Sequence, residues 1–257
     1  MRTYRTGAAV ALRTMAGKMM VAAIALVAAA AMRAAPTAQA QNTLTAAEKS
    51  AGWRLLFDGA TTAGWHPFGK DNSVAPSKAN GWDVSDGTLV ALGRGTETTA
   101  DIATNEDYAS FELLVDWKLA PQANSGIFFH VVEAGQKEIY ATGPEYQLID
   151  DDGWPGPLEA WQKTGANYAM HPPLAKAAKP VGEWNQTRIV VNGDHVEHWL
   201  NGVKTSDYRL WTPEWIALRA NGKWKDYPAY GAAKQGKLGL QNHGNMSWFR
   251  NIKVRPR

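Results

Sequence analysis

The feature that most constrains the fold is a series of short strand-like segments separated by turn residues. Residues 111–119 alternate apolar and polar side chains, which is typical of a strand with one buried face. Asp86-Gly87, Asn192-Gly193-Asp194 and Asn201-Gly202 are turn signals between such segments. Helical signals are confined to a capping box at 45–48 and a Thr-Pro pair at 212–213. The pattern predicts an all-β sandwich or jelly roll of two packed antiparallel sheets.

The first forty residues have the features of a secretory signal peptide. A basic start is followed by the uncharged apolar run 19–31 and then by Ala38-Gln39-Ala40, a cleavage signal. The apolar run is short for a membrane span. We therefore expect cleavage before Gln41 and a periplasmic or secreted protein without a membrane anchor. The predicted organisation is a signal peptide at 1–40, an N-terminal segment at 41–52 and one β domain at 53–257.

Composition limits the classes of partner. The net charge of +3 includes five basic residues of the leader, and without them it is about −2, so no basic patch suggests nucleic acid. The chain has no cysteine, which excludes a lipid-modified cysteine and means that the core alone holds an exported domain together. Twelve tryptophans are present, and exposed aromatic rings commonly stack on sugars.

The segment from Gly143 to Asp152 is the strongest candidate for a binding surface. In an extended strand Glu145 and Gln147 share one face, whereas Tyr146 and Leu148 share the other. A strand inside a sheet can bury such a polar row only where the row lines a cleft or meets partners. We interpret this row as the floor of a sugar-binding groove. The alternative is an edge strand whose polar face lies in water.

Four histidines occur inside three strand-like segments, at positions 130, 195, 198 and 243. His198 shares a face with apolar neighbours, so its ring is either packed and neutral or directed into a cleft. His130 can equally be a hydrogen-bonded core histidine or a residue of the site. Gln241 and His243 repeat the spacing of Glu145 and Gln147. No metal-binding, nucleophile-elbow, phosphate-loop or dinucleotide motif is present, nor is the Glu-x-Asp-x-x-Glu array of laminarinase-type glycosidases.

Seven ordered motifs resemble one known family. The sequence is similar to the 3-keto-disaccharide hydrolase family over nearly all of residues 53 to 255. The resemblance rests on the segments Leu56–Gly59, Trp82–Gly87, Asn124–Phe128, Gly143–Asp150, Gly182–Asn185, His198–Gly202 and Leu240–Ile252. The family's fold is a concanavalin-like (laminin-G-like) jelly roll, which agrees with the strand pattern.

The resemblance implies cleavage of glycosides already oxidised at C3. The 3-ketone acidifies the C2 proton, a base removes it, the aglycone leaves from C1, and water adds to the enone. This chemistry needs a base near C2, a cation or donors at the C3 oxygen, and an acid for the leaving oxygen.

The resemblance also implies site residues. Glu145 is the candidate base or metal ligand, and His198 and His243 are candidates for proton transfer. The same three residues are the candidates for holding a divalent metal ion, the one cofactor considered. The remaining candidates bind the carbohydrate substrate, with His130 or Lys223 polarising the ketone; they are Asn124, His130, Gln147, Trp199, Asn201, Lys223 and Gln241. The family often has Arg in place of His130, and Ser-Lys-Phe in place of Gly222-Lys223-Trp224, which leaves the substrate and the cation open.

Two alternatives remain from the sequence. Tryptophan-rich jelly rolls also bind glycans by stacking without catalysis. A structural domain of the cell envelope is a further possibility, and for that class no polar cleft is expected.

Overall fold

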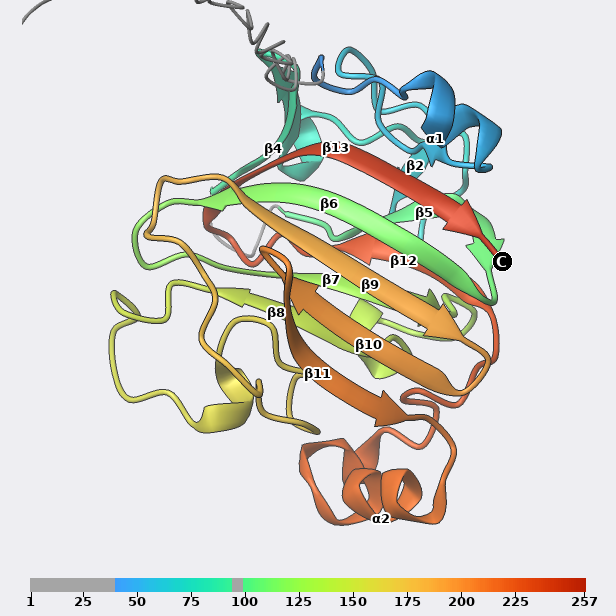
Figure 1. Cartoon of the computed structure of the whole chain (residues 1–257), viewed down its shortest axis with the longest axis vertical. Helices are drawn as coiled ribbons and strands as arrows, with labels where there is room; N and C mark the ends of the chain where they lie inside the picture. The colour runs from blue at the N-terminus through green and yellow to red at the C-terminus, as the bar shows by residue number, and fades with distance from the viewer. Residues whose placement is uncertain (1–39, 94–98) are drawn as a thin grey trace, which may run out of the picture. The chain divides into compact units, whose positions relative to one another are not determined.

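The computed structural model describes residues 40–93 and 99–257, and the predicted signal peptide lies outside these residues except for Ala40. The described chain forms two antiparallel sheets packed face to face, with little helix (Figure 1). The predicted jelly-roll sandwich of two antiparallel sheets is confirmed.

The larger sheet has the strand order β11-β10-β9-β6-β13-β4-β3, with β1 also paired to β13. Its strands are β1 (Arg54–Leu55), β3 (Trp82–Ser85), β4 (Thr88–Leu92), β6 (Phe111–Leu119), β9 (Asn185–Asn192), β10 (His195–Leu200), β11 (Val203–Arg209) and β13 (Met246–Pro256).

The smaller sheet has the order β2-β5-β12-β7-β8. Its strands are β2 (Trp65–Pro67), β5 (Ile102–Tyr108), β7 (Asn124–Val131), β8 (Glu145–Ile149) and β12 (Gly236–Leu240). The helices are α1 (Ala46–Ser50) and α2 (Pro213–Asn221), with short 3₁₀ turns η1 (Lys78–Asn80), η2 (Ile139–Ala141), η3 (Ala160–Gln162) and η4 (Lys223–Asp226).

Alternating side chains on β6 build the core between the sheets. Phe111, Leu113, Val115 and Trp117 are buried, as the alternation predicted. Burial of each such side chain stabilises the fold by about 1.5–3 kcal/mol. From the smaller sheet, β7 is buried on both faces, as suits its nearly continuous apolar residues.

The turns and helix starts that local sequence signals predicted are present in the structure. The Asp86-Gly87 turn joins β3 and β4 as a hairpin. Thr45 caps α1 through a capping box with Glu48, and Thr212 caps α2 with Pro213 in its first turn.

The segment before β1 packs on the domain through Asn42. The side-chain amide of Asn42 donates to Gly87 O (2.8 Å). The backbone N–H groups of Asn42 and Asn251 each donate to the side-chain oxygen of the other residue.

Strand β8 is an edge strand, but a loop covers its free edge. Gln147 N–H donates to Ala166 O (3.1 Å), Gly165 N–H to Gln147 O (2.9 Å), and Tyr168 N–H to Glu145 O (3.0 Å). The loop therefore satisfies the backbone groups that an edge strand normally exposes. It also brings Tyr168 beside the outer face of the smaller sheet.

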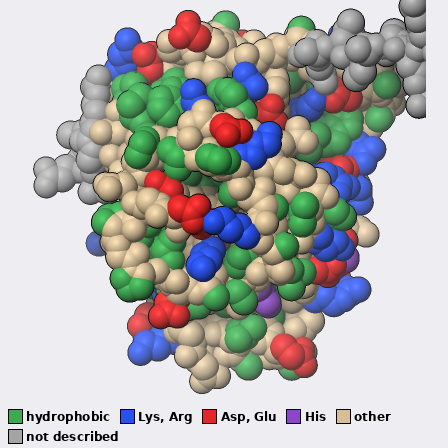
Figure 2. All heavy atoms as spheres, turned by 60° about the vertical axis from the view of Figure 1, so that its left-hand side comes forward, with side chains coloured by type: hydrophobic (Ala, Val, Ile, Leu, Met, Phe, Trp, Pro, Cys, Tyr) green, Lys and Arg blue, Asp and Glu red, His purple; other side chains and the backbone are tan. Residues whose placement is uncertain are grey.

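The described surface is mixed in character. On the face shown in Figure 2, acidic and basic side chains are interspersed among hydrophobic ones. Within residues 40–93 and 99–257, no helix has the length and apolar composition needed to cross a membrane.

A buried carboxylate ties three neighbouring strands of the larger sheet together. Glu112 on β6 accepts hydrogen bonds from Arg188 on β9, from Arg255 on β13, and from Arg257 (3.1 Å). Despite partial burial, these guanidinium groups hold the pKa of Glu112 below its ordinary value of 4.5. The ion pairs therefore stabilise the fold above pH 4.5, and this stabilisation is lost as the pH falls through the lowered folded-state pKa.

We predict that Glu112→Gln lowers the free energy of unfolding by about 1–2 kcal/mol at pH 7, because the three arginines lose their anionic partner. Urea unfolding at pH 7 and pH 3.5 measures this change. The difference between variant and wild type is expected to shrink at pH 3.5. An equal difference at both pH values would show that the ion pairs do not cause it.

Candidate active site

The polar row predicted on β8 is present and buried. Glu145 and Gln147 lie on the outer face of the smaller sheet, with 4% and 2% of their surface exposed, whereas Tyr146 and Leu148 belong to the core. The predicted division of faces is therefore confirmed. Although β8 is an edge strand, its polar face is not in water.

Gly126 gives the Glu145 carboxylate room on the neighbouring strand. A Cβ atom added at Gly126 would clash with Glu145 Oε1, so the carboxylate lies directly over this glycine. Any side chain at this position would displace it.

The sheet register extends this row across the smaller sheet. Ile102 of β5 pairs with Leu240 of β12, and Leu240 also pairs with Ile127 of β7. Asp101, directly before Ile102, therefore lies beside Gln241, directly after Leu240. Gln241 N–H donates to Gly126 O (2.9 Å), and Gly126 pairs with Gln147. Asp101, Gln241, Gly126 and Gln147 thus form one row across four strands spaced about 4.8 Å apart.

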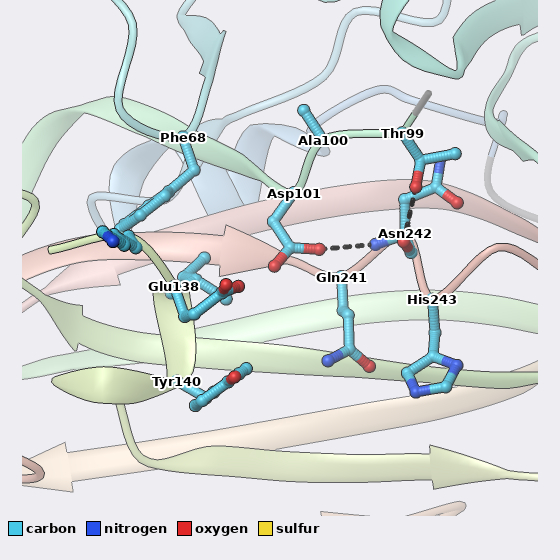
Figure 3. Close-up of a pocket in the computed structure, with 11 residues that line it drawn as sticks. Phe68, Thr99, Ala100, Asp101, Glu138, Tyr140, Gln241, Asn242 and His243 are labelled. Atoms are coloured by element: carbon cyan, nitrogen blue, oxygen red, sulfur yellow. Dashed lines mark hydrogen bonds between the residues drawn. The ribbon is translucent and has the colours of Figure 1, made fainter. Parts of the chain in front are cut away.

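Two adjacent cavities open on this row, and we call them together the cleft. The Glu145 cavity has a volume of about 110 Å³ and is lined by Asn124, Tyr140, Glu145, Gln147, Tyr168, Lys223, Trp224, Gln241 and His243. The Asp101 cavity has about 400 Å³ and is lined by Phe68, Thr99, Ala100, Asp101, Lys137, Glu138, Ile139, Tyr140, Gln241, Asn242 and His243 (Figure 3). Tyr140, Gln241 and His243 line both cavities.

Three amide oxygens in the cleft have no hydrogen-bond partner. They are Oδ1 of Asn124, Oε1 of Gln147 and Oε1 of Gln241, each buried. A buried acceptor without a partner is costly, and such groups usually await a water or a ligand. Sugar hydroxyl groups are donors of the right kind for these oxygens.

Burial and nearby charges shift the pKa values of the cleft's ionisable groups. Burial raises the pKa of Glu145 to about 8; the nearby Lys223 cation opposes this rise, and the Asp101 carboxylate adds to it. Burial raises the pKa of Asp101 to about 7, opposed by the Asn242 N–H group and supported by Glu138. Burial also lowers the pKa of His243, so that its ring is uncharged at neutral pH.

Lys223 supplies the cation of the Glu145 cavity. Its Nζ donates to the Tyr168 hydroxyl (3.0 Å) and lies 4.1 Å from the centre of that ring. Trp224, next in the chain, is stacked on Tyr230 with ring centres 4.1 Å apart. The packed tryptophan anchors η4, which keeps the flexible lysine at the cleft.

The structure separates His198 from the cleft. Its ring lies in the core between the sheets, fully buried and packed against Tyr146 and Tyr208. Nδ1–H donates to Gly165 O (3.4 Å), which leaves Nε2 to accept from the Tyr208 hydroxyl (3.1 Å). Burial lowers the pKa of His198 to about 3, so the ring is neutral. Of the three catalytic candidates, only Glu145 and His243 line the cleft, so the assignment of His198 to the site was wrong.

Three predicted substrate contacts also lie away from the cleft. His130 bonds to Ala109 O (2.7 Å) and packs against Phe111 and Phe129. The Trp199 ring centre lies 5.4 Å from the Arg188 guanidinium and 5.1 Å from Lys204 Nζ, and the indole N–H donates to Glu197. The Asn201 side-chain amide donates to Ala177 O and to the Asn185 side chain in a turn. Strand alternation could not reveal which sheet, or which face, each of them belongs to. Asn124, Gln147, Lys223 and Gln241 do line the Glu145 cavity.

Several other cleft residues have no local signal in the sequence. Asp101 joins the row only through the pairing of β5 with β12, whereas Tyr140 comes from the η2 turn and Tyr168 from a loop. Their positions depend on contacts between distant parts of the chain. Only a knowledge of the strand order would have identified them.

The predicted metal ligands Glu145, His198 and His243 do not form a cluster in the described part of the chain, and the cluster that the structure contains lies elsewhere. Among the residues that the structure describes, a His/Asp/Glu cluster with ligand atoms within 4.8 Å of one another occurs at His195, Glu197 and Asp207. Lys204 Nζ already binds both carboxylates there, at 2.6 and 2.7 Å. In the cleft, the Glu145 carboxylate and the unpartnered amide oxygens are the kinds of ligand that hard divalent ions prefer.

We predict that His198→Ala lowers the free energy of unfolding by about 2–4 kcal/mol, because it leaves a cavity and unpaired core groups at Gly165 and Tyr208. Denaturant unfolding checks this value. Because the folded-state pKa is depressed, the histidine's contribution is present above pH 6.5 and declines as the unfolded chain takes up a proton below it. A stable variant that has lost only activity would contradict the core role.

Comparisons with known proteins agree with this architecture. The model of the 3-keto-alpha-glucoside-1,2-lyase-like domain matches residues 52–255. A 3-keto-disaccharide hydrolase from Bacteroides thetaiotaomicron is 32% identical over 231 residues, which cover 79% of this chain and 78% of that protein.

Two solved structures from Parabacteroides distasonis, each described as a "putative glycosyl hydrolase", are also similar. One is 40% identical with a TM-score of 0.77, covering 85% of this chain and all of that one. The second is 28% identical with a TM-score of 0.57, covering 75% of this chain and 99% of that one. These relatives support glycoside hydrolase activity, and the chain belongs to the 3-keto-alpha-glucoside-1,2-lyase-like domain family.

Proposed function

We propose that this protein cleaves the glycosidic bond of 3-keto-glycosides by removing the C2 proton, eliminating the aglycone and adding water. The family assignment and the name of the Bacteroides relative support this substrate class. The observation that carries the proposal is the buried Glu145 carboxylate, held over Gly126 beside the Lys223 cation and among unpartnered amide oxygens. Export to the periplasm or beyond is part of the same proposal.

Glu145 is the base in this reaction. Its raised pKa of about 8 makes the carboxylate a stronger proton acceptor than a solvated glutamate. A positioned general base accelerates proton transfer by about 10²–10⁴-fold. Because Gly126 carries no side chain, the Glu145 carboxylate can lie directly over the sheet at this position and face the cleft.

Lys223 stabilises the negative charge that develops on the C3 oxygen. Loss of the C2 proton gives an enolate, and a preorganised donor at such an oxygen contributes about 3–4 kcal/mol. Asn124, Gln147 and Gln241 orient the ring through its hydroxyl groups. The neutral His243 is available to exchange a proton with water.

A non-catalytic carbohydrate-binding module is the second candidate. The aromatic side chains of the cleft would serve binding as well as catalysis. The two functions differ in their products: a binding module retains an intact 3-keto-glycoside, whereas the enzyme releases the aglycone. Incubation of the purified protein with a 3-keto-disaccharide, followed by chromatography of the sugars, distinguishes them.

We predict that Glu145→Gln lowers kcat for a 3-keto-glucoside by about 10²–10⁴-fold, because the amide cannot accept the C2 proton. Initial rates of sugar release measure the loss. Glu197→Gln is the matched control, since Glu197 pairs with Lys204 outside the cleft. A loss of less than tenfold would remove Glu145 from the chemistry.

We predict that Lys223→Met lowers kcat by about 100-fold, because the enolate oxygen loses its cation. Lys225→Met is the control, since Lys225 is an exposed lysine of the same η4 turn that does not line the cleft. Unchanged kcat with a raised KM in Lys223→Met would mean that the lysine binds substrate and does not stabilise the enolate.

A further inference from the structure

We infer that Asp101 is the acid that protonates the leaving oxygen, and that the Asp101 cavity holds the leaving sugar. This inference rests on the proposed function and assigns a role that neither the sequence motifs nor the family comparison gave. Four observations support it: the position of Asp101 in the row, the orientation of its carboxyl group, the charges around it, and the shape of its cavity.

The position of Asp101 suits an acid that works together with Glu145. The two carboxyl groups lie on either side of Gln241, since Asp101 is beside Gln241 and the Glu145 carboxylate lies over Gly126. Asp101 and Gly126 are two strand spacings apart, about 10 Å between backbones. The C2 proton and the leaving oxygen on C1 are on adjacent atoms of the sugar. A ring placed over Gln241 therefore has one carboxyl group on each side.

Hydrogen bonding fixes one oxygen of Asp101 and leaves the other available. Oδ1 accepts from Asn242 N–H (2.9 Å), whereas for Oδ2 no partner is found among residues 40–93 and 99–257. In Figure 3 the free side of the carboxyl group points into the cavity, toward Glu138 and away from Asn242. A substrate oxygen in this cavity can therefore reach a carboxyl group that is already oriented.

The charges around the two carboxyl groups favour different protonation states. Asp101 faces Glu138, whose negative charge favours a proton on Asp101, while Glu145 faces Lys223, whose charge favours the carboxylate. Lys137, Tyr140 and the neutral His243 complete the ionisable lining of the Asp101 cavity. These neighbouring charges favour the form in which Asp101 carries the proton and Glu145 is the carboxylate, although burial gives Glu145 the higher pKa, about 8 against about 7, so this reactive form is the minor one.

The Asp101 cavity has the size and lining of a second sugar site. It has about 400 Å³, and the Phe68 and Tyr140 rings lie on the side of Glu138 (Figure 3). Aromatic rings of this kind pack against the apolar face of a pyranose. Because it joins the Glu145 cavity through Gln241 and Tyr140, one disaccharide can span both.

The proposed roles balance over one catalytic cycle. The Glu145 carboxylate takes the C2 proton, the C1–O bond breaks, and the leaving oxygen takes the Asp101 proton. Water then adds to C1 of the enone and gives its proton to the Asp101 carboxylate, while Glu145 returns a proton to C2. Both carboxyl groups regain their starting states, and the net reaction consumes one water.

The test compares two leaving groups on wild type and Asp101→Asn. A 3-keto-disaccharide releases a sugar alkoxide that needs a proton, whereas a 3-keto 4-nitrophenyl glucoside releases a nitrophenolate that does not. We expect Asp101→Asn to lose at least about 100-fold in kcat/KM on the disaccharide. We expect less than about threefold loss on the nitrophenyl glucoside, and this retained activity also shows that the variant is folded.

The pH profile gives a second readout. For the disaccharide, wild-type kcat/KM is expected to be bell-shaped with its maximum between pH 7 and 8: activity rises as Glu145 ionises and falls as Asp101 loses its proton. On the nitrophenyl glucoside, neither wild type nor Asp101→Asn is expected to show the alkaline limb, because the leaving nitrophenolate needs no proton. The acid limb of Asp101→Asn is expected to lie at lower pH than that of wild type on this substrate, because the Asp101 charge no longer raises the pKa of Glu145.

Two further variants serve as controls. Glu197→Gln, outside the cleft, is expected to keep wild-type rates on both substrates. Glu138→Gln is expected to shift the alkaline limb to lower pH, because it removes the charge that holds the proton on Asp101.

Equal losses on both substrates, or no loss on the disaccharide, would overturn the role of Asp101 while leaving the proposed function intact. If wild type cleaves neither 3-keto substrate, the proposed function fails first.

Discussion

The burial of a carboxylate on an edge strand is the constraint on which the cleft depends. An edge strand normally exposes its backbone and its polar face to water. Here the loop at 165–168 pairs with β8 along its free edge, and Lys223, Tyr168 and Trp224 close over its outer face. Glu145 is desolvated as a result, and its pKa rises. The same arrangement leaves the neighbouring amide oxygens without partners until a ligand arrives.

The core and the cleft are connected through the segments that cover β8. Gly165 O accepts from His198, Thr205 and Ser206 between the sheets, while Gly165 N–H pairs with Gln147 of the cleft strand. Beyond this carbonyl, stacked rings continue from Tyr208 through Trp215 and Tyr230 to Trp224. His198 thus supports the position of β8 without taking part in the chemistry. Packing of this kind is what holds a catalytic side chain in a fixed geometry.

Local patterns predicted the parts of the fold that depend on neighbouring residues. The alternation on β6, the Asp86-Gly87 hairpin and the two faces of β8 are all properties of short segments. Strand β11 follows the Asn201-Gly202 turn signal, but its consecutive residues Thr205 and Ser206 are both buried, with hydrogen bonds to Gly165 O. Its hydrophobic alternation is therefore weak.

The candidate site depended on information that no single segment carries. The alternation of side chains along a strand shows that His198 shares a face with apolar residues. It does not show whether that face lies against the core or lines a cleft, and only the position of the strand in its sheet distinguishes these two cases. Asp101 lies beside Gln241 because β5 pairs with β12, although about 140 residues separate the two. Glu145 and Gln147 were identified correctly as a buried polar row because their spacing alone gives the face, and burial of that face demands a cleft.

The most direct measurement is the rate of cleavage of a 3-keto-disaccharide that carries deuterium at C2, compared with the unlabelled substrate. If a buried carboxylate removes that hydrogen during bond cleavage, the labelled substrate reacts several-fold more slowly under conditions where chemistry limits the rate. Equal rates under those conditions would contradict proton removal at C2 and would point to direct displacement at C1 instead.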